Sequence, residues 1–182
     1  MKPMLFACAA LMLALRPAAH AADLASIDCV AKTIGPAAVT RIVTAKADSF
    51  KTPLDEAMGK DFQGFRDALA RCRASNKWSD KAAALAENVF RSTINRDANT
   101  IGLRKLGFDP QAVIASYRTM DESLRRSISR GEFPSAMMSV IADELTRQGA
   151  DDNTDREVAM RSGVLFVSLA LLEFTPEVFA EA

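Results

Sequence analysis

Apolar side chains recur at every third or fourth position along most of this chain, and they never alternate with polar ones over the length of a strand. This spacing places them on one face of an α-helix. Proline, glycine and capping residues separate the periodic stretches by short connections. The pattern predicts an all-α fold, a helical bundle of about six to eight helices. The predicted helices begin near Leu24, Pro36, Thr52-Pro53, Ser79, Asp109-Pro110, Pro134, Thr154 and Thr175-Pro176.

The segment 91–105, RSTINRDANTIGLRK, is the richest in hydrogen-bonding side chains. We expect it to form a polar connector after a helical hairpin that ends near residue 97. Functional residues often lie on such connectors, so Asn95, Arg96, Asp97 and Asn99 form a candidate polar site. The same residue types also cap helices and form turns, which explains the segment without any function.

The C-terminal run from Gly163 to Leu172 is apolar at almost every position, and Arg161 and Glu173 bracket it with charge. Ten residues of helix rise about 15 Å, half of what a membrane span requires. A helix that is apolar on nearly every side is normally surrounded by others. We therefore predict the central helix of the bundle here, followed by a short separate helix from Thr175-Pro176.

The first 21 residues have the three parts of an export signal. The second residue is a lysine, positions 4–15 are all apolar, and Ala19-His20-Ala21 offers small side chains for cleavage. Twelve helical residues span about 18 Å, so a cleaved signal is favoured over an uncleaved anchor. We expect one mature all-α domain, residues 22–182, in a periplasm or outside a cell, with no membrane span after cleavage.

Export changes the interpretation of the cysteines. Cys8 would leave with the signal, so the mature chain holds Cys29 and Cys72, which are 43 positions apart. In an oxidising compartment such a pair predicts a structural disulfide rather than two free thiols. The spacing matches neither a CxxC redox motif nor a zinc knuckle.

The disulfide would orient the first helix. On that helix Cys29 lies nearly opposite Ile27 and Ile34, which form an apolar stripe with Val30. If Cys29 faces Cys72, something else must cover this stripe. We favour the C-terminal apolar helix, and the alternative is a docking surface for a partner.

Charge is unevenly distributed along the mature chain. Residues 22–131 carry 18 basic and 13 acidic side chains, whereas residues 132–182 carry 3 basic and 10 acidic ones. The favoured interpretation is that the two parts neutralise each other in the folded chain, and the alternative is a basic partner for the acidic end. With a slightly negative mature chain and an export signal, nucleic acid is a poor candidate partner.

Histidine is missing from the mature sequence, because His20 belongs to the signal. This excludes serine–histidine and cysteine–histidine catalysis, histidine zinc sites and histidine bases. A pair of carboxylates acting on cell-wall glycan is the enzyme class that survives. Its candidate acids look like ordinary helix-surface residues, apart from Asp97 in the polar segment. These acids are Glu87, Asp97, Glu122 and Glu144.

Two parts of the sequence partly match the ligand patterns of metal sites. Residues 151–157, DDNTDRE, offer oxygen ligands, but Arg156 replaces the glycine of a calcium loop and Ser162 replaces its final glutamate. The methionines would suit copper, but they fall on apolar stripes, where packing explains them. We predict no metal, no cofactor and no catalytic residue.

These observations favour an exported, non-enzymatic helical protein that works by binding, such as an inhibitor, immunity protein, chaperone or accessory subunit. Its partner would be another envelope protein. A carrier of a hydrophobic small molecule or lipid is the second hypothesis, and a carboxylate-based glycan hydrolase or lyase is the third.

Overall fold

The computed structural model describes residues 22–150 and 156–182. Within these ranges the regular structure consists of α-helices and short 3-10 helices, without a strand, which confirms the predicted all-α helical bundle. The export signal, the calcium-loop candidates of 151–155 and the capping residue Thr154 lie outside the described residues. The elements in chain order are η1 (Leu24–Ser26), α1 (Cys29–Ile34), α2 (Pro36–Asp48), α3 (Leu54–Met58), η2 (Gly59–Asp61), α4 (Phe62–Asn76), α5 (Asp80–Lys105), α6 (Pro110–Arg118), α7 (Glu122–Ser129), α8 (Ser135–Arg147) and α9 (Arg156–Ala180).

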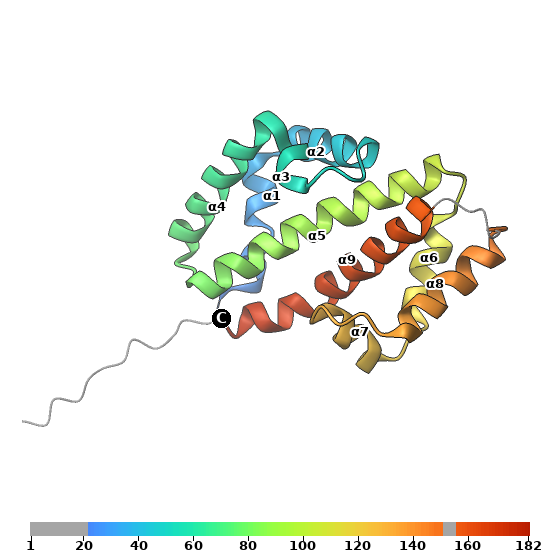
Figure 1. Cartoon of the computed structure of the whole chain (residues 1–182). Helices are drawn as coiled ribbons and strands as arrows, with labels where there is room; N and C mark the ends of the chain where they lie inside the picture. Colours follow the sequence, from blue (N-terminus) through green and yellow to red (C-terminus); the bar gives the residue numbers. More distant parts are fainter. Residues whose placement is uncertain (1–21, 151–155) are drawn as a thin grey trace, which may run out of the picture.

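The two longest helices, α5 and α9, run antiparallel and side by side through the middle of the molecule (Figure 1). Helices α1–α4 lie on one side of this pair and α6–α8 on the other. The chain ends beside the start of α5, where the Ser79 hydroxyl donates to the backbone oxygen of Ala182 at 2.8 Å. The C-terminal helix is therefore central, as the sequence predicts.

Each side of the α5–α9 pair has its own apolar cluster. The N-terminal cluster gathers buried residues of α2, α4 and α5 around Phe65 and receives Phe179 from the end of α9. The C-terminal cluster gathers residues of α6, α7 and α8 around Leu165 and Phe166 of α9. Phe65, Leu165 and Phe166 are completely buried, and α5 and α9 contribute residues to both clusters.

Several helix starts follow the predicted capping chemistry. The side chains of Ser79 and Asp109 accept hydrogen bonds from the first turns of α5 and α6, and Pro36 begins α2. Pro53 and Pro134 precede their helices by one residue instead of beginning them. The predicted boundaries are therefore correct to within about a residue at these positions.

The predicted polar connector after residue 97 is wrong, because α5 continues without interruption to Lys105. The hydroxyls of Thr93 and Thr100 and the amide of Asn99 bond to carbonyl oxygens one turn earlier, so they do not break the helix. Ile94 and Leu103 on the same helix are fully buried. Burial of this apolar face therefore outweighs the low helix propensity of the polar residues.

The predicted break at Thr175-Pro176 is also wrong, because α9 continues through Pro176 to Ala180. Proline removes one backbone hydrogen bond from a helix. Phe174 and Phe179 are buried on either side of it, and Phe179 meets Trp78 edge-on with ring centroids 5.6 Å apart. This packing holds the last turns of α9 in place.

The predicted helix starts near Asp109-Pro110 and Pro134 leave room for one long helix between them. Instead, α6 ends at Arg118 and α7 begins at Glu122. Tyr117, Met120 and Ile128 are nevertheless all buried in the C-terminal cluster. The turn lets both short helices direct apolar residues towards α9.

Helix α9 is the described helix that is long and apolar enough to cross a membrane by length and composition, with 39% of its most apolar window buried inside the molecule. The apolar run from Gly163 to Leu172 covers less than half of this helix, which has 25 residues. The length of α9 therefore does not exclude a membrane span. Packing gives α9 its central place, because Leu165, Phe166 and Ala170 are completely buried. The absence of a span in the mature protein stays a prediction.

The disulfide joins Cys29 of α1 to Cys72 of α4, with the sulfur atoms 2.06 Å apart. Cys72 is buried in the N-terminal cluster, and the Thr33 hydroxyl lies 3.4 Å from its sulfur. The bond fixes the short helix α1, which has only six residues, against α4.

Candidate functional site

The structure separates the four residues of the predicted polar site. Asn99 is buried, and its amide donates to the carbonyl oxygen of Asn95 one turn earlier on α5. Arg96 and Asp97 form their own half-exposed ion pair, 2.7 Å apart. Asn95 alone of the four lines a described hollow, together with Lys46 and Phe50. The four residues therefore lie along one continuous helix and have different partners.

The predicted docking stripe lies within the protein's own core. Val30 is completely buried, and Ile27 and Ile34 are half-buried against the N-terminal cluster. That cluster takes most of its residues from α2, α4 and α5, and from α9 it receives only Phe179. Helix α9 is therefore a minor part of the cover, contrary to the favoured expectation.

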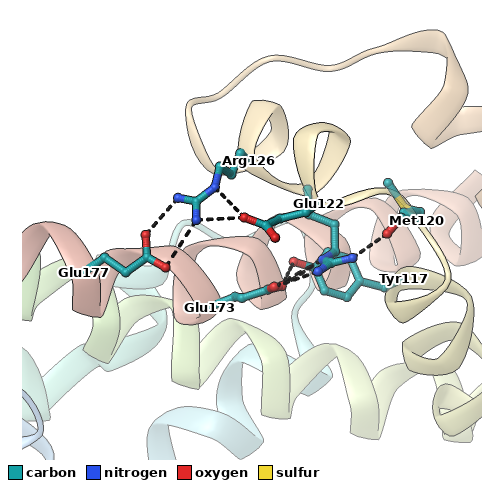
Figure 2. Close-up of polar contacts among 7 residues, drawn as sticks. Tyr117, Met120, Glu122, Arg126, Glu173 and Glu177 are labelled. Atoms are coloured by element: carbon teal, nitrogen blue, oxygen red, sulfur yellow. Dashed lines mark hydrogen bonds and ion pairs between the residues drawn. The ribbon is translucent and has the colours of Figure 1, made fainter.

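A dense group of polar contacts among the described residues lies where α6 and α7 meet α9 (Figure 2). The Tyr117 hydroxyl donates to a carboxylate oxygen of Glu173 at 2.6 Å. Arg125 donates to both oxygens of the same carboxylate and, through another nitrogen, to the carbonyl oxygen of Met120. One carboxylate of α9 thus binds both the end of α6 and the start of α7.

A second arginine strengthens this junction. Arg126 donates to Glu122 on its own helix at 2.9 Å and to Glu177 on α9 at 2.8 Å (Figure 2). Its guanidinium also lies over the ring of Phe174, 4.4 Å from the centroid. Arg126 thus pairs with Glu122 within α7, whereas the neighbouring Arg125 pairs with Glu173 of α9.

The titration of this group does not suit acid–base catalysis near neutral pH. Burial, and then the hydrogen bond to Glu173, raise the pKa of Tyr117 far above its ordinary value. Burial alone would raise the pKa of Glu173, but hydrogen bonds from Arg125 and Tyr117 bring it below its ordinary value. The tyrosine stays protonated and the glutamate stays ionised near neutral pH. The contacts of this group therefore stabilise the packing of α6 and α7 against α9.

Glu144 was expected on a helix surface, but the structure buries it, with 2% of its side chain exposed. It accepts hydrogen bonds from Ser116 at 2.7 Å and Gln148 at 2.7 Å, and it pairs with Arg147. Burial alone would raise its pKa, but these bonds and the charge of Arg147 lower it below the ordinary value. A general acid for glycoside hydrolysis needs the opposite shift.

A groove of about 460 Å³ lies where α4 turns into α5. We call it the basic groove. Arg66, Arg73 and Lys77 supply its charge, and its apolar lining comes mainly from Leu69, Ala74 and Trp78.

Helical spacing creates this groove. Arg66, Ala70, Arg73 and Lys77 follow at intervals of four, three and four residues, so they share one side of α4. The indole of Trp78 is fixed at the end of the groove, because its nitrogen donates to the Ser26 hydroxyl at 3.0 Å. The spacing was available in the sequence, but the groove also needs the turn that brings α5 alongside.

Lys77 holds an unusual backbone position at this turn. It follows the last residue of α4 in the left-handed conformation, with φ of 55°, where glycine is the usual residue. It is the one described residue other than glycine with positive φ. A left-handed residue with a Cβ costs about 1–2 kcal/mol. Such strain is a reason to look for a function of the side chain.

The cations of the basic groove are largely unneutralised. Arg73 pairs with Asp80, whereas Arg66 and Lys77 take part in no ion pair among the described residues. The described acidic residues of the C-terminal part of the chain do not neutralise this groove. Glu173 and Glu177 form ion pairs with the arginines of α7 instead. Internal neutralisation, the favoured interpretation of the charge asymmetry, therefore operates at α7 but leaves α4 positive.

Comparisons with known proteins give no relative: no family model, no curated protein and no solved structure matches this chain. Over the described residues, no group of three or more histidine, cysteine, aspartate or glutamate side chains is placed to hold a metal ion.

Proposed function

We propose that the mature chain is an exported, non-enzymatic binding protein that acts in a periplasm or outside the cell. Its partner is an acidic segment of another envelope protein, which lies in the basic groove between α4 and α5. The observation that carries this proposal is the combination of Arg66, Arg73 and Lys77 with an apolar lining that includes the fixed indole of Trp78.

The chemistry of the groove suits an acidic peptide. Carboxylates would neutralise Arg66 and Lys77, which have no ion-pair partner among the described residues. Apolar side chains between the carboxylates would cover Leu69 and Ala74. Aromatic and arginine side chains are also the residues most often found at the centres of protein interfaces.

The protonation states of the polar clusters support binding over catalysis. The Tyr117–Glu173 pair and Glu144 are all held in protonation states that disfavour proton transfer near neutral pH. The glycan hydrolase hypothesis therefore ranks below binding. The carrier of a hydrophobic small molecule stays the second hypothesis, and the hollow lined by Lys46, Phe50 and Met160 is the observation that favours it.

The proposal is tested by retaining envelope proteins on the immobilised mature protein. Arg66→Glu combined with Lys77→Glu should weaken retention of the partner roughly tenfold, because two attractive contacts become repulsive. The matched control is Arg104→Glu with Arg118→Glu, two exposed cations far along the chain with the same change in net charge. Equal losses of retention from both pairs of substitutions would show that only the net charge of the protein matters, and would contradict the proposal.

Lys77→Gly separates binding from folding. It removes a cation and also the left-handed strain, so the free energy of unfolding should rise by about 1 kcal/mol while partner retention falls. A variant that is more stable and binds equally well would show that Lys77 is not part of the binding surface.

A further inference from the structure

A second hollow, of about 390 Å³, lies between the α2–α3 connection, α5 and α9. We call it the amphipathic pocket. Most of its wall is apolar, and Phe50, Leu54, Met160 and Val164 form that part. Lys46, Lys51 and Asn95 provide its polar groups. Met160 keeps 45% of its surface exposed, although it belongs to the most apolar helix of the protein.

Lys46 is a partly buried cation at this pocket. Its ammonium group donates to the carbonyl oxygens of Phe50 and Thr52, both at 2.6 Å. An ammonium group has three donors, so one remains for another acceptor. Neither Lys46 nor Lys51 takes part in an ion pair among the described residues. The two lysines therefore give the pocket an uncompensated positive charge.

A third cation lies behind the pocket wall. The guanidinium of Arg161 is 4.7 Å from the centroid of the Phe50 ring, and the ammonium of Lys46 is 5.5 Å from the same centroid. Arg161 is buried, donates to the Ala47 carbonyl oxygen at 2.9 Å and pairs with Glu157. Burial, and then the charge of Arg161, lower the pKa of Lys46. An anion in the pocket would relieve this accumulation of positive charge.

We propose that the amphipathic pocket binds a small carboxylate with an apolar tail. The carboxylate would accept from the free donor of Lys46 and from Lys51, while the Asn95 amide offers a further donor. The tail would lie against Phe50 of the α2–α3 connection, Leu54 of α3 and Met160 of α9, which supply the apolar surface. A volume of 390 Å³ is within the range of small-molecule sites. This site is separate from the basic groove and does not depend on the proposed protein partner.

The test is a titration of the mature protein with octanoate, followed by NMR of the methionine methyl groups. The Met160 methyl signal should shift and saturate, whereas Met138 is the internal control, because it is similarly exposed but does not line the pocket. Octan-1-ol, which has the same tail without the charge, should bind roughly tenfold more weakly. Shifts of both methyl groups without saturation, or no shift of Met160, would overturn the proposal.

Charge recognition is tested by Lys51→Gln against Lys60→Gln. Both lysines are exposed, but of the two only Lys51 lines the pocket. Octanoate should therefore bind Lys51→Gln at least about threefold more weakly than the wild type and bind Lys60→Gln as the wild type does. Equal affinities for the two variants, or equal affinities for octanoate and octan-1-ol, would contradict a carboxylate site. Arg66→Glu with Lys77→Glu should leave octanoate binding unchanged, so failure of this site and failure of the basic groove are distinguishable.

Discussion

Gly102 shows how one residue sets the distance between the two central helices. A Cβ atom built at this position would lie 2.1 Å from a guanidinium nitrogen of Arg161. Arg161 cannot easily move away, because Ala47, Glu157 and the Phe50 ring all hold its guanidinium. The absent side chain therefore makes room for a buried cation of α9 against α5.

This arrangement predicts opposite effects for two alanine substitutions. Gly102→Ala should lower the free energy of unfolding by about 1–3 kcal/mol, because Arg161 loses buried hydrogen bonds. Gly163→Ala, on α9 with no atom near its Cβ position, should raise it by about 0.5–1 kcal/mol through helix propensity. Urea unfolding of both variants measures the difference. Equal stabilisation by both would show that Arg161 is not held against Gly102.

Burial of individual polar residues was not predictable from the sequence. Asn99, Glu144 and Arg161 each occupy a position that periodicity leaves ambiguous, and all three are buried. Their burial depends on partners distant in the sequence, such as Ser116 for Glu144 and the Ala47 carbonyl oxygen for Arg161. A hydrophobic pattern carries no information about these partners.

Among the elements, the disulfide contributes most to holding the short helix α1 in place. Helix α1 has six residues, too few to be stable alone in water, and Cys29 joins it to the fifteen-residue helix α4. The bond closes a loop across 43 positions, so it restricts the unfolded chain strongly.

Removal of this bond should destabilise the fold substantially. Cys29→Ala with Cys72→Ala should lower the free energy of unfolding by about 4 kcal/mol, and reduction of the wild-type protein should give a similar loss. Urea unfolding with and without reductant is the measurement, and mass spectrometry of unreduced peptides gives the pairing. Two free thiols in the purified protein, with unfolding unaffected by reductant, would contradict the disulfide.

Helix starts were predictable where a side chain determines them, as at Ser79 and Asp109. The ends of elements were harder to predict. Asn95, Asp97 and Pro176 looked like interruptions, but α5 and α9 continue through them because apolar residues on both sides are buried. Tertiary packing thus outweighs local preference at these positions.

In the whole molecule, α5 and α9 contribute to both apolar cores. The surface charges differ between the two sides of this helix pair. The arginines of α7 neutralise Glu173 and Glu177, so the acidic C-terminal part is partly satisfied internally. Helix α4 keeps Arg66 and Lys77 without ion pairs among the described residues. The sequence gives the total charge but cannot show which cations remain unpaired, because the ion pairs form between distant helices.

The basic groove is proposed to bind an acidic envelope protein. The most direct test of this proposal is a photo-crosslinking amino acid at Ala70, an exposed position in the groove, introduced in the cells that make the protein. Ala136, exposed on α8, is the matched control position. We predict one dominant adduct from Ala70 to an acidic protein, absent from Ala136 and lost with Arg66→Glu and Lys77→Glu. The same adducts from both positions, or none from Ala70, would contradict the account.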